Sequence, residues 1–217
     1  MSQNAHDNFK GALLMMASMA AFTLNDAFMK AISGELPLFQ ILTLRGVLTV
    51  VLIAAMMFLR GATDFSIPRK DRGKVMLRVV AETASAYFFL TALFNMPLAN
   101  LTAILQVVPL AVTLASAVIL REAVGWRRSL AIAVGFCGVL LIVRPGPEGF
   151  NIWSIYALIA MLGVTLRDLV TRQLSPEVPS MTVTLVTAGS ITIAAGVASL
   201  SAPWVPVSGD IALLIAG

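Results

Sequence analysis

Residues 23–37 read TLNDAFMKAISGELP, and residues 165–179 read TLRDLVTRQLSPEVP. The second segment lies 142 residues after the first, and the two share six of their fifteen residues. Two unrelated segments of this length would share about one residue, because a common amino acid has a usage of roughly 5 to 10%. The segment is therefore an internal repeat. Outside it the same offset gives almost no further identity, so its meaning depends on the rest of the chain.

The composition is typical of a membrane protein. Hydrophobic residues make up 59% of the 217 residues and charged residues 12%, and the mean hydropathy is +0.91, which is far from soluble domains. Seven apolar stretches approach the ~20 residues that a helix needs to cross a bilayer. They lie at about 11–31, 37–59, 75–96, 98–120, 127–144, 152–172 and 180–201. An eighth starts at Ile211 but reaches only Gly217. We therefore predict an all-α polytopic membrane protein with seven spans and the start of an eighth.

The basic residues gather in alternate loops. The second-to-third and fourth-to-fifth connections hold eight of them: Arg60, Arg69, Lys70, Arg72, Lys74, Arg121, Arg127 and Arg128. The loops of opposite parity hold only Lys30 and Arg144. Cytoplasmic loops of membrane proteins carry such an excess of Lys and Arg. The pattern predicts a cytoplasmic N-terminus and excludes a nucleic-acid-binding reading of the net charge of +4.

Five spans separate the two copies of the repeat. Because five is odd, the second copy must enter the membrane in the opposite orientation to the first. We therefore predict inverted five-span repeats, with a first repeat at 11–146 and an incomplete second repeat at 150–217 of a ten-span architecture that continues beyond Gly217. Inverted repeats are typical of transporters, in which a midplane site faces each side of the membrane in turn.

The repeat contains two acid and cation pairs at helical spacing. Asp26 precedes Lys30 by four residues near the outer end of the first span, and Asp168 precedes Arg172 in the same way near the inner end of the sixth. In one interpretation, each pair is a gate that closes its own side of the transporter. In the other, the pairs are ordinary ion pairs at helix ends, with the long side chains reaching the interface.

Two charged residues lie deeper in the spans. Arg45 is about 12 Å inward from the outer end of the second span, and Glu82 is about as far from the inner end of the third, at ~1.5 Å per residue. Arg78 and Ser85 continue the Glu82 face. In a substrate pathway, Arg45 would dock an anionic substrate and Glu82 would contact a cation or exchange a proton, which would make protons the coupling ion. The alternative pairs Arg45, Glu82 and Arg78 with one another between helices.

The fourth span carries a polar stripe at steps of four and three residues, namely Thr102, Gln106, Pro109, Thr113 and Ser116. Pro109 lacks an N–H and leaves the Leu105 carbonyl without its helical donor, which predicts a kink near midspan. The stripe indicates the wall of a substrate cavity, or else a close helix contact with a harmless kink. Cys137 lies inside the fifth span, so it indicates neither a disulfide framework nor a metal cluster.

Residues 86–146 resemble the EamA domain of the drug/metabolite transporter superfamily. The resemblance rests on Ala92 and Leu93, Pro109, Glu122, and the Gly135 and Gly138 pair, with Arg45 where the family often has an arginine. It implies ten spans and secondary transport of amino acids, vitamins, nucleotide-like metabolites or drugs across the bacterial cytoplasmic (inner) membrane. Members include amino-acid exporters and importers of S-adenosylmethionine or riboflavin, so neither cargo nor direction follows.

Other classes of protein have less support in the sequence. The chain has no HExxH or GxSxG motif and no cysteine and histidine pair, so we predict no enzyme activity, no cofactor and no metal site. The expected partners are a small-molecule substrate and the lipid bilayer, and a homodimer stays open. The alternative function is a non-transporting scaffold or a half-transporter that needs a partner chain.

Overall fold

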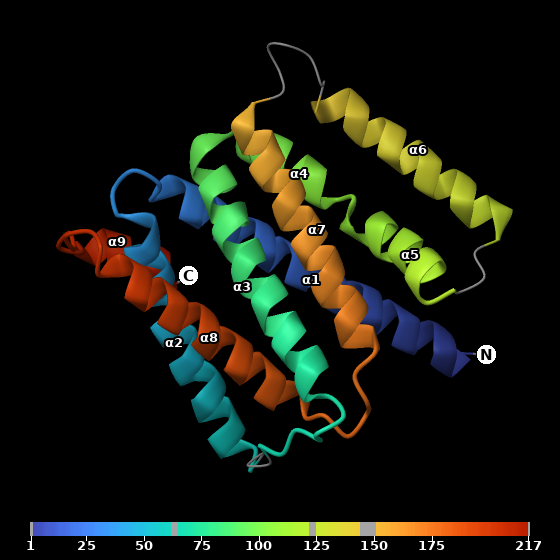
Figure 1. The fold of residues 1–217 in the computed structure, drawn as a ribbon, viewed down its shortest axis with the longest axis horizontal. Helices are drawn as coiled ribbons and strands as arrows, with labels where there is room; N and C mark the ends of the chain where they lie inside the picture. Colours follow the sequence, from blue (N-terminus) through green and yellow to red (C-terminus); the bar gives the residue numbers. More distant parts are fainter. Residues whose placement is uncertain (1, 62–64, 122–124, 144–150, 217) are drawn as a thin grey trace.

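The computed structural model describes residues 2–61, 65–121, 125–143 and 151–216. These residues are helical apart from short connections and one isolated bridge between Ser33 and Leu36. The helices are α1 (Ser2–Ala31), α2 (Leu38–Leu59), α3 (Arg72–Asn95), α4 (Leu98–Leu105), α5 (Val108–Ile119), α6 (Trp126–Val143), α7 (Ile152–Arg172), α8 (Ser180–Ser199) and α9 (Gly209–Ala216), as Figure 1 shows. The predicted all-α architecture is confirmed. Glu122 lies outside the described residues.

Six stretches of the described residues are long and apolar enough to span a bilayer: Phe9–Ala31, Leu38–Leu59, Arg72–Asn95, Leu98–Ile119, Ile152–Arg172 and Ser180–Ser199. The predicted fifth span corresponds to α6, in which a shorter apolar stretch, Ser129–Gly138, is described. In the most apolar 18-residue stretch of α2, only 11% of the residues are buried within the chain. Most of its aliphatic side chains therefore face outwards. Lipid tails solvate such surfaces, and the chain is an integral membrane protein.

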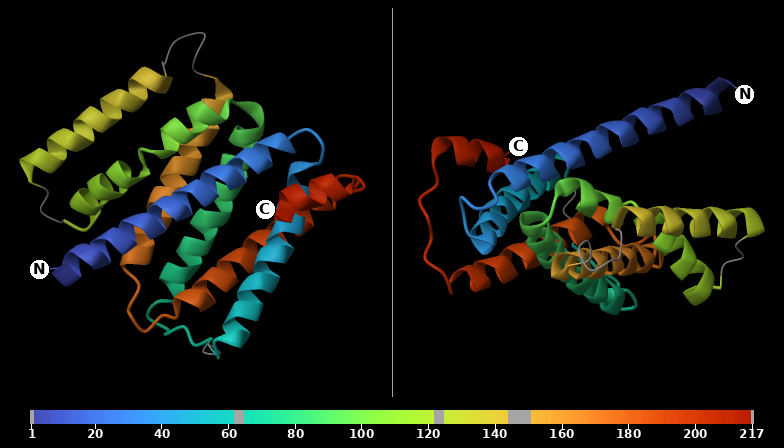
Figure 2. Two further views of the ribbon diagram at one scale, coloured as in Figure 1. Left: turned by 180° about the vertical axis from the view of Figure 1, so that it is seen from behind. Right: turned by 90° about the horizontal axis from the view of Figure 1, so that it is seen from above.

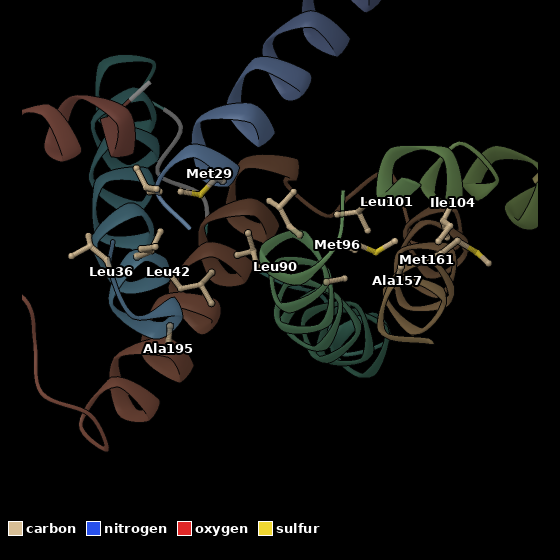
Figure 3. Packing of buried hydrophobic residues seen from close by; sticks show 14 of the residues in the cluster. Met29, Leu36, Leu42, Leu90, Met96, Leu101, Ile104, Ala157, Met161 and Ala195 are labelled. Carbon is tan, nitrogen blue, oxygen red and sulfur yellow. The ribbon is translucent and has the colours of Figure 1, made fainter. Parts of the chain in front are cut away.

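Helix α3 is the centre of the bundle. It packs along α7 on one side, and on the other it contacts α8, which packs against α2. Buried apolar side chains extend from α1 and α2, past Leu90 and Met96 at the end of α3, to Leu101 and Ile104 on α4 and Met161 on α7 (Figure 3). Most of this core lies at the end of the bundle where α3 finishes and α4 begins, so the opposite half of the α3–α7 contact is free to hold polar residues.

Small residues allow the central helices to approach closely. A Cβ atom added at Gly46 of α2 would collide with Thr192 of α8, and one at Gly163 of α7 would collide with the Ser85 hydroxyl of α3. In membranes such small-residue contacts drive helix association, because lipid tails are as apolar as the side chains they would otherwise meet. Gly135 likewise meets a leucine side chain of α5, whereas a Cβ at Gly138 would meet nothing within 4 Å.

The fourth span is a broken helix. α4 ends at Leu105, Gln106 and Val107 form a turn, and α5 begins at Val108, with Pro109 in its first turn. Proline has no N–H to offer the carbonyl four residues earlier, which is the Leu105 carbonyl, and the helix separates there. The predicted kink near midspan is therefore confirmed as an interruption. Broken spans place free backbone groups inside membrane transporters, where they line cavities or pack against protein.

Helix α1 stands apart from the others along much of its length. Only its C-terminal part lies against the bundle, and its N-terminal part runs away from the other helices (Figure 2). Apolar side chains along it, including Phe9, Leu14, Met16 and Phe22, are more than 60% exposed within the chain. Asp26 and Lys30 lie on the part of α1 that contacts the bundle, so the first copy of the repeat is positioned by packing.

Candidate functional site

The main polar site inside the membrane is an ion-pair network between α3 and α7. Nη1 of Arg167 lies 2.9 Å and 3.1 Å from the two carboxylate oxygens of Glu82. Nη2 and Nε of the same guanidinium both lie 2.8 Å from Oδ1 of Asp168. The side chains are 22% exposed for Glu82, 27% for Arg167 and 37% for Asp168. One arginine thus contacts two carboxylates, which lowers the cost of holding both acids at a low-dielectric position.

Arg167 is the functional residue that sequence reasoning missed. It lies inside the repeated segment, where the first copy has Asn25, and its place near the end of its span makes it look like an ordinary helix-end charge. The signal that would have found it is this substitution of an arginine for a neutral residue directly before the repeated aspartate. The interhelical interpretation of Glu82 proposed Arg45 and Arg78 as partners, and Arg167 takes the close contact in their place.

Arg78 extends this site toward α8. Its Nε donates to the Thr171 hydroxyl at 2.9 Å, and its Nη1 donates to the Thr187 hydroxyl at 2.7 Å. The offset that relates the two repeated segments, 142 residues, makes Thr187 the counterpart of Arg45. The second copy therefore has a threonine where the first has an arginine, and a guanidinium from α3 reaches that threonine. As predicted, Arg78, Glu82 and Ser85 share one face, and this face packs on α7 and α8.

The predicted pairing of Asp26 with Lys30 is wrong. Lys30 Nζ lies 2.7 Å from the Leu93 carbonyl, 3.2 Å from that of Phe94 and 3.1 Å from that of Met96, at the C-terminal end of α3. A cation is stabilised there because the last carbonyls of a helix lack partners and carry partial negative charge. Arg45 on α2 acts on Asp26 electrostatically, without an ion pair between the two among the described residues.

The pairing of Asp168 with Arg172 is also wrong. Asp168 binds Arg167, its neighbour in the chain, and Arg172 Nη1 lies 3.4 Å from the Ser116 hydroxyl on α5. In neither copy does the acid contact the cation four residues later, because a spacing of four makes such a contact possible without requiring it. The acids keep mirrored places, with Asp26 close to the end of α1 and Asp168 close to the end of α7.

The two copies of the repeat lie at opposite ends of α3. The first copy reaches its C-terminal end through Lys30, and the second reaches its N-terminal end, where the Ser175 hydroxyl donates to Oδ2 of Asp71 at 2.6 Å. At 24 residues, α3 is about 36 Å long, since each residue adds ~1.5 Å. Segments of similar sequence are therefore separated by about the thickness of a bilayer.

Polar contacts hold the second copy to the start of α3. Lys74 Nζ donates to the Gln173 carbonyl at 2.7 Å, and Lys70 forms an exposed ion pair of 2.9 Å with Glu177. The hydrogen bond from Ser175 lowers the pKa of Asp71 below its ordinary value of 3.8, and the side chain of Asp71 is only 2% exposed. The hydrogen bond and the charge of Glu177 raise the pKa of Lys70.

The polar stripe of the fourth span divides at the helix break. Gln106 and Pro109 are exposed and Thr102 is half-buried on α4 and the start of α5, whereas Thr113 and Ser116 are buried. The hydroxyl of Thr113 donates to the Pro109 carbonyl at 2.8 Å. The described contacts do not bring Thr102 and Gln106 together with Arg45 and Glu82, since Thr102 donates to the Ala99 carbonyl and Glu82 binds Arg167.

Two hollows among the described residues lie close to these helix contacts. A small one of about 70 Å³ lies between α2, α3 and α8 and includes Phe39 and Tyr87, whose rings stack with centroids 6.0 Å apart. A larger one of about 270 Å³ lies near the N-terminal end of α3, between Arg78 and the α7–α8 connection. No cluster of three His, Cys, Asp or Glu residues that could hold a metal ion occurs in this part of the chain.

Comparisons with known proteins agree with these features. Residues 9–144 match the EamA-like transporter family. A riboflavin transporter of Vibrio cholerae is 28% identical over 153 residues, which are 69% of this chain and 51% of that protein. A pseudopaline exporter of Pseudomonas aeruginosa is 26% identical over 76% of this chain and 57% of its own length. An S-adenosylmethionine uptake transporter of Rickettsia prowazekii is 22% identical over 75% of this chain and 55% of its own length.

The chain spans about half the length of the curated relatives it matches. No solved structure matches it. The family match covers more than half of the chain, from α1 through α6, and therefore includes the broken fourth span and the arginine of α2. The chain belongs to the EamA-like transporter family.

Proposed function

We propose that this chain forms the first repeat and the beginning of the second repeat of a secondary transporter, which moves small organic metabolites across the bacterial cytoplasmic membrane by alternating access. The observation that carries the proposal is the position of the two repeated segments at opposite ends of α3. Two similar units in opposite orientations can exchange conformations, so that each end of the bundle opens in turn.

The ion-pair network is the proposed inner gate. Glu82 on α3 and Arg167 on α7 join the helices near the end that carries Ser175, and Lys74 and Lys70 bind the following connection. Opening this end requires α3 and α7 to separate, which means exchanging these contacts for water or substrate. Coulomb attraction across such a partly buried contact is strong enough to favour closure and weak enough to be reversed by substrate binding.

Asp26 and Arg45 form the proposed outer counterpart. Arg45 on α2 acts electrostatically on Asp26 on α1, at the end that carries the first copy of the repeat. The gate pairs therefore change from the initial prediction, in which each acid paired with the cation four residues later. Asp26 and Asp168 remain gate residues in the proposal. Lys30 instead binds carbonyls at the end of α3, and Arg172 contacts α5.

The pathway residues of the proposal remain Arg45, Glu82, Ser85, Thr102, Gln106, Pro109 and Thr113. The broken fourth span supports the role of Gln106 and Pro109, because an interrupted helix offers backbone groups to a solute. Ser85 lies in the tight contact with Gly163, where it would act through the α3–α7 packing. The close contact with Arg167 favours Glu82 as a counter-charge over Glu82 as the carrier of a coupling proton.

The substrate class follows from the relatives and from the charges in the spans. The three relatives are named for riboflavin, pseudopaline and S-adenosylmethionine, which are polar organic molecules of different shapes. A membrane site that offers both guanidinium and carboxylate groups suits solutes that carry charges of their own. One of these relatives is named an exporter and another an uptake transporter. The test therefore measures transport in both directions.

The test is a transport assay in a strain that lacks the gene and carries the full-length gene on a plasmid. Uptake and efflux of riboflavin, S-adenosylmethionine and amino acids are measured with the wild type, with Arg167→Gln and with Arg69→Gln. Arg69 is an exposed cation at the same end of the protein and serves as the matched control. The proposal expects transport of at least one solute, lost in Arg167→Gln and kept in Arg69→Gln. Equal transport by all three proteins would refute the proposed role of Arg167 in an inner gate.

A further inference from the structure

The larger hollow, at the inner end of α3, has the features of a binding site. Its volume is about 270 Å³. The lining comes from α3, α7, α8 and the α7–α8 connection and includes one charged side chain, Arg78, together with the hydroxyl-bearing residues Thr171, Ser175, Ser180 and Thr184. The remaining lining is apolar, from Leu174, Pro176, Val178 and Val183. A single fixed charge in a partly apolar hollow is typical of sites for small ligands.

Arg78 is held in place by neutral groups. Thr171 on α7 and Thr187 on α8 accept hydrogen bonds from its Nε and Nη1, which fixes the plane of the guanidinium between the two helices. Nη2 has no contact partner among the described residues. A preorganised guanidinium with a free edge can bind a carboxylate or phosphate with little loss of side-chain entropy.

The positive charge of Arg78 is not cancelled by contact. Glu82 and Asp168 act on it electrostatically, but Arg167 takes the close contacts of both carboxylates. Within the described residues no carboxylate lies within ion-pair distance of Arg78. A half-buried cation without a contact anion is costly in a membrane protein, and an anionic ligand would remove that cost.

The other hydroxyl groups that line the hollow already donate hydrogen bonds, except that of Ser180. Thr171 donates to the Arg167 carbonyl, Thr184 to the Ser180 carbonyl, and Ser175 to Asp71. Ser180 is exposed at the first residue of α8 and its hydroxyl is available to a ligand. The recognition chemistry of the hollow is therefore an arginine with a hydroxyl beside it, which fits an oxyanion, and the arginine charge repels a cation.

The depth of Arg78 in the membrane favours a soluble anion over a lipid headgroup as its ligand. Arg78 is six residues into α3, which places it about 9 Å inward from the start of the helix at ~1.5 Å per residue. Lipid phosphates lie at the level of the helix ends, outside the hydrocarbon core. The hollow itself is lined by residues of three helices and the α7–α8 connection, so a soluble anion would bind between parts of the protein.

We propose that this hollow is an anion-binding site at the inner mouth of the protein, at which Arg78 binds the carboxylate or phosphate group of a small soluble molecule. This inference deepens the proposed function, because it gives the transported solute an anionic group and a first contact on the inner side. Binding itself does not depend on transport. The site therefore has its own test.

The experiment measures thermal unfolding of the purified full chain in a neutral detergent, titrated with inorganic phosphate or succinate at constant ionic strength. A ligand that binds only the folded state raises the unfolding temperature in a saturable way. We expect this rise in the wild type and in Arg69→Gln. We expect the apparent affinity to fall about tenfold or more in Arg78→Gln, because charge-assisted contacts are the strongest of their kind.

A second variant tests the proposal independently, in case Arg78→Gln does not fold. Ser180→Phe fills the hollow from an exposed position and leaves Arg78 and its two threonines unchanged, so it should abolish the effect of both anions. The same titrations in nanodiscs of phosphatidylcholine, with and without phosphatidylglycerol, identify the source of the anion. Stabilisation by phosphatidylglycerol alone, no saturable effect in the wild type, or an effect in Arg78→Gln and Ser180→Phe as large as that in the wild type would each overturn the proposal. A transport failure with binding retained would count only against the proposed function.

Discussion

The contact between Glu82 and Arg167 predicts a measurable energetic coupling between α3 and α7. At a separation of about 3 Å and an effective dielectric constant of ~20, the Coulomb attraction is about 5 kcal/mol. Desolvation of both groups offsets much of it, since their side chains are only 22% and 27% exposed. We expect a coupling free energy of about 2 kcal/mol from a double-mutant cycle of Glu82→Gln and Arg167→Gln.

The single variants should be unequal. Arg167→Gln leaves both Glu82 and Asp168 without their contact cation and should lower the free energy of unfolding by about 3 kcal/mol. Glu82→Gln leaves Arg167 bound to Asp168 and should cost between about 1 and 2 kcal/mol. The double variant should be at least as stable as Arg167→Gln, because removing Glu82 also removes the repulsion between two uncompensated acids.

The assay is reversible unfolding by sodium dodecyl sulfate in mixed micelles, followed by tryptophan fluorescence, with Trp153 on α7 as one reporter. The control cycle is Lys70→Gln with Glu177→Gln, an ion pair of the same length whose side chains are 59% and 65% exposed. Exposed pairs are screened by water and salt, and this cycle should show no measurable coupling. A coupling near zero for Glu82 and Arg167, or equal costs for the two single variants, would refute the reasoning.

Three further outcomes follow from other contacts. Gly163→Ala should destabilise the protein by about 1 to 3 kcal/mol through collision with α3, while Gly138→Ala, with open space around it, should be neutral or slightly stabilising, as unfolding in mixed micelles will measure. Lys30→Gln should cost about 1 to 2 kcal/mol in the same assay, because three carbonyls at the end of α3 lose a charged donor; an unchanged stability would show that water replaces it fully. The lowered pKa of Asp71 stabilises the fold above pH 3.8 and this stabilisation is lost as the pH falls through the lowered value, so Ser175→Ala should reduce the loss of thermal stability between pH 5 and about pH 3, and an identical acid dependence would count against the hydrogen bond.

The sequence predicted the spans well because the bilayer imposes one length and one chemistry on every crossing helix. It also predicted the break at Pro109, since a missing N–H is a local property of the chain. It failed on the pairs of Asp26 and Asp168. Spacing within a helix reports which side chains can meet, but the carbonyls at the end of α3 and the neighbouring Arg167 offered stronger partners from other places.

Contacts between helices were the least accessible to sequence reasoning. Arg167 and Glu82 are 85 residues apart, and nothing in either span specifies which face meets the other. The contact between Gly163 and Ser85 determines which faces of α3 and α7 meet, because a methyl group at position 163 would collide with the Ser85 hydroxyl. The repeat gave partial help, because it marked residues 165–179 as a distinct segment, in which Arg167 contacts α3 and Ser175 contacts the residue before it.

The central claim is that the two copies of the repeat lie on opposite faces of the membrane. Glu35 and Glu177 are equivalent residues of the two copies, and both are exposed. Each is replaced by cysteine in a Cys137→Ser background, and intact cells are treated with a membrane-impermeant maleimide before and after permeabilisation. We predict that Glu35→Cys is labelled in intact cells and Glu177→Cys only after permeabilisation. Labelling of both positions from the same side would contradict the inverted arrangement and the transport mechanism built on it.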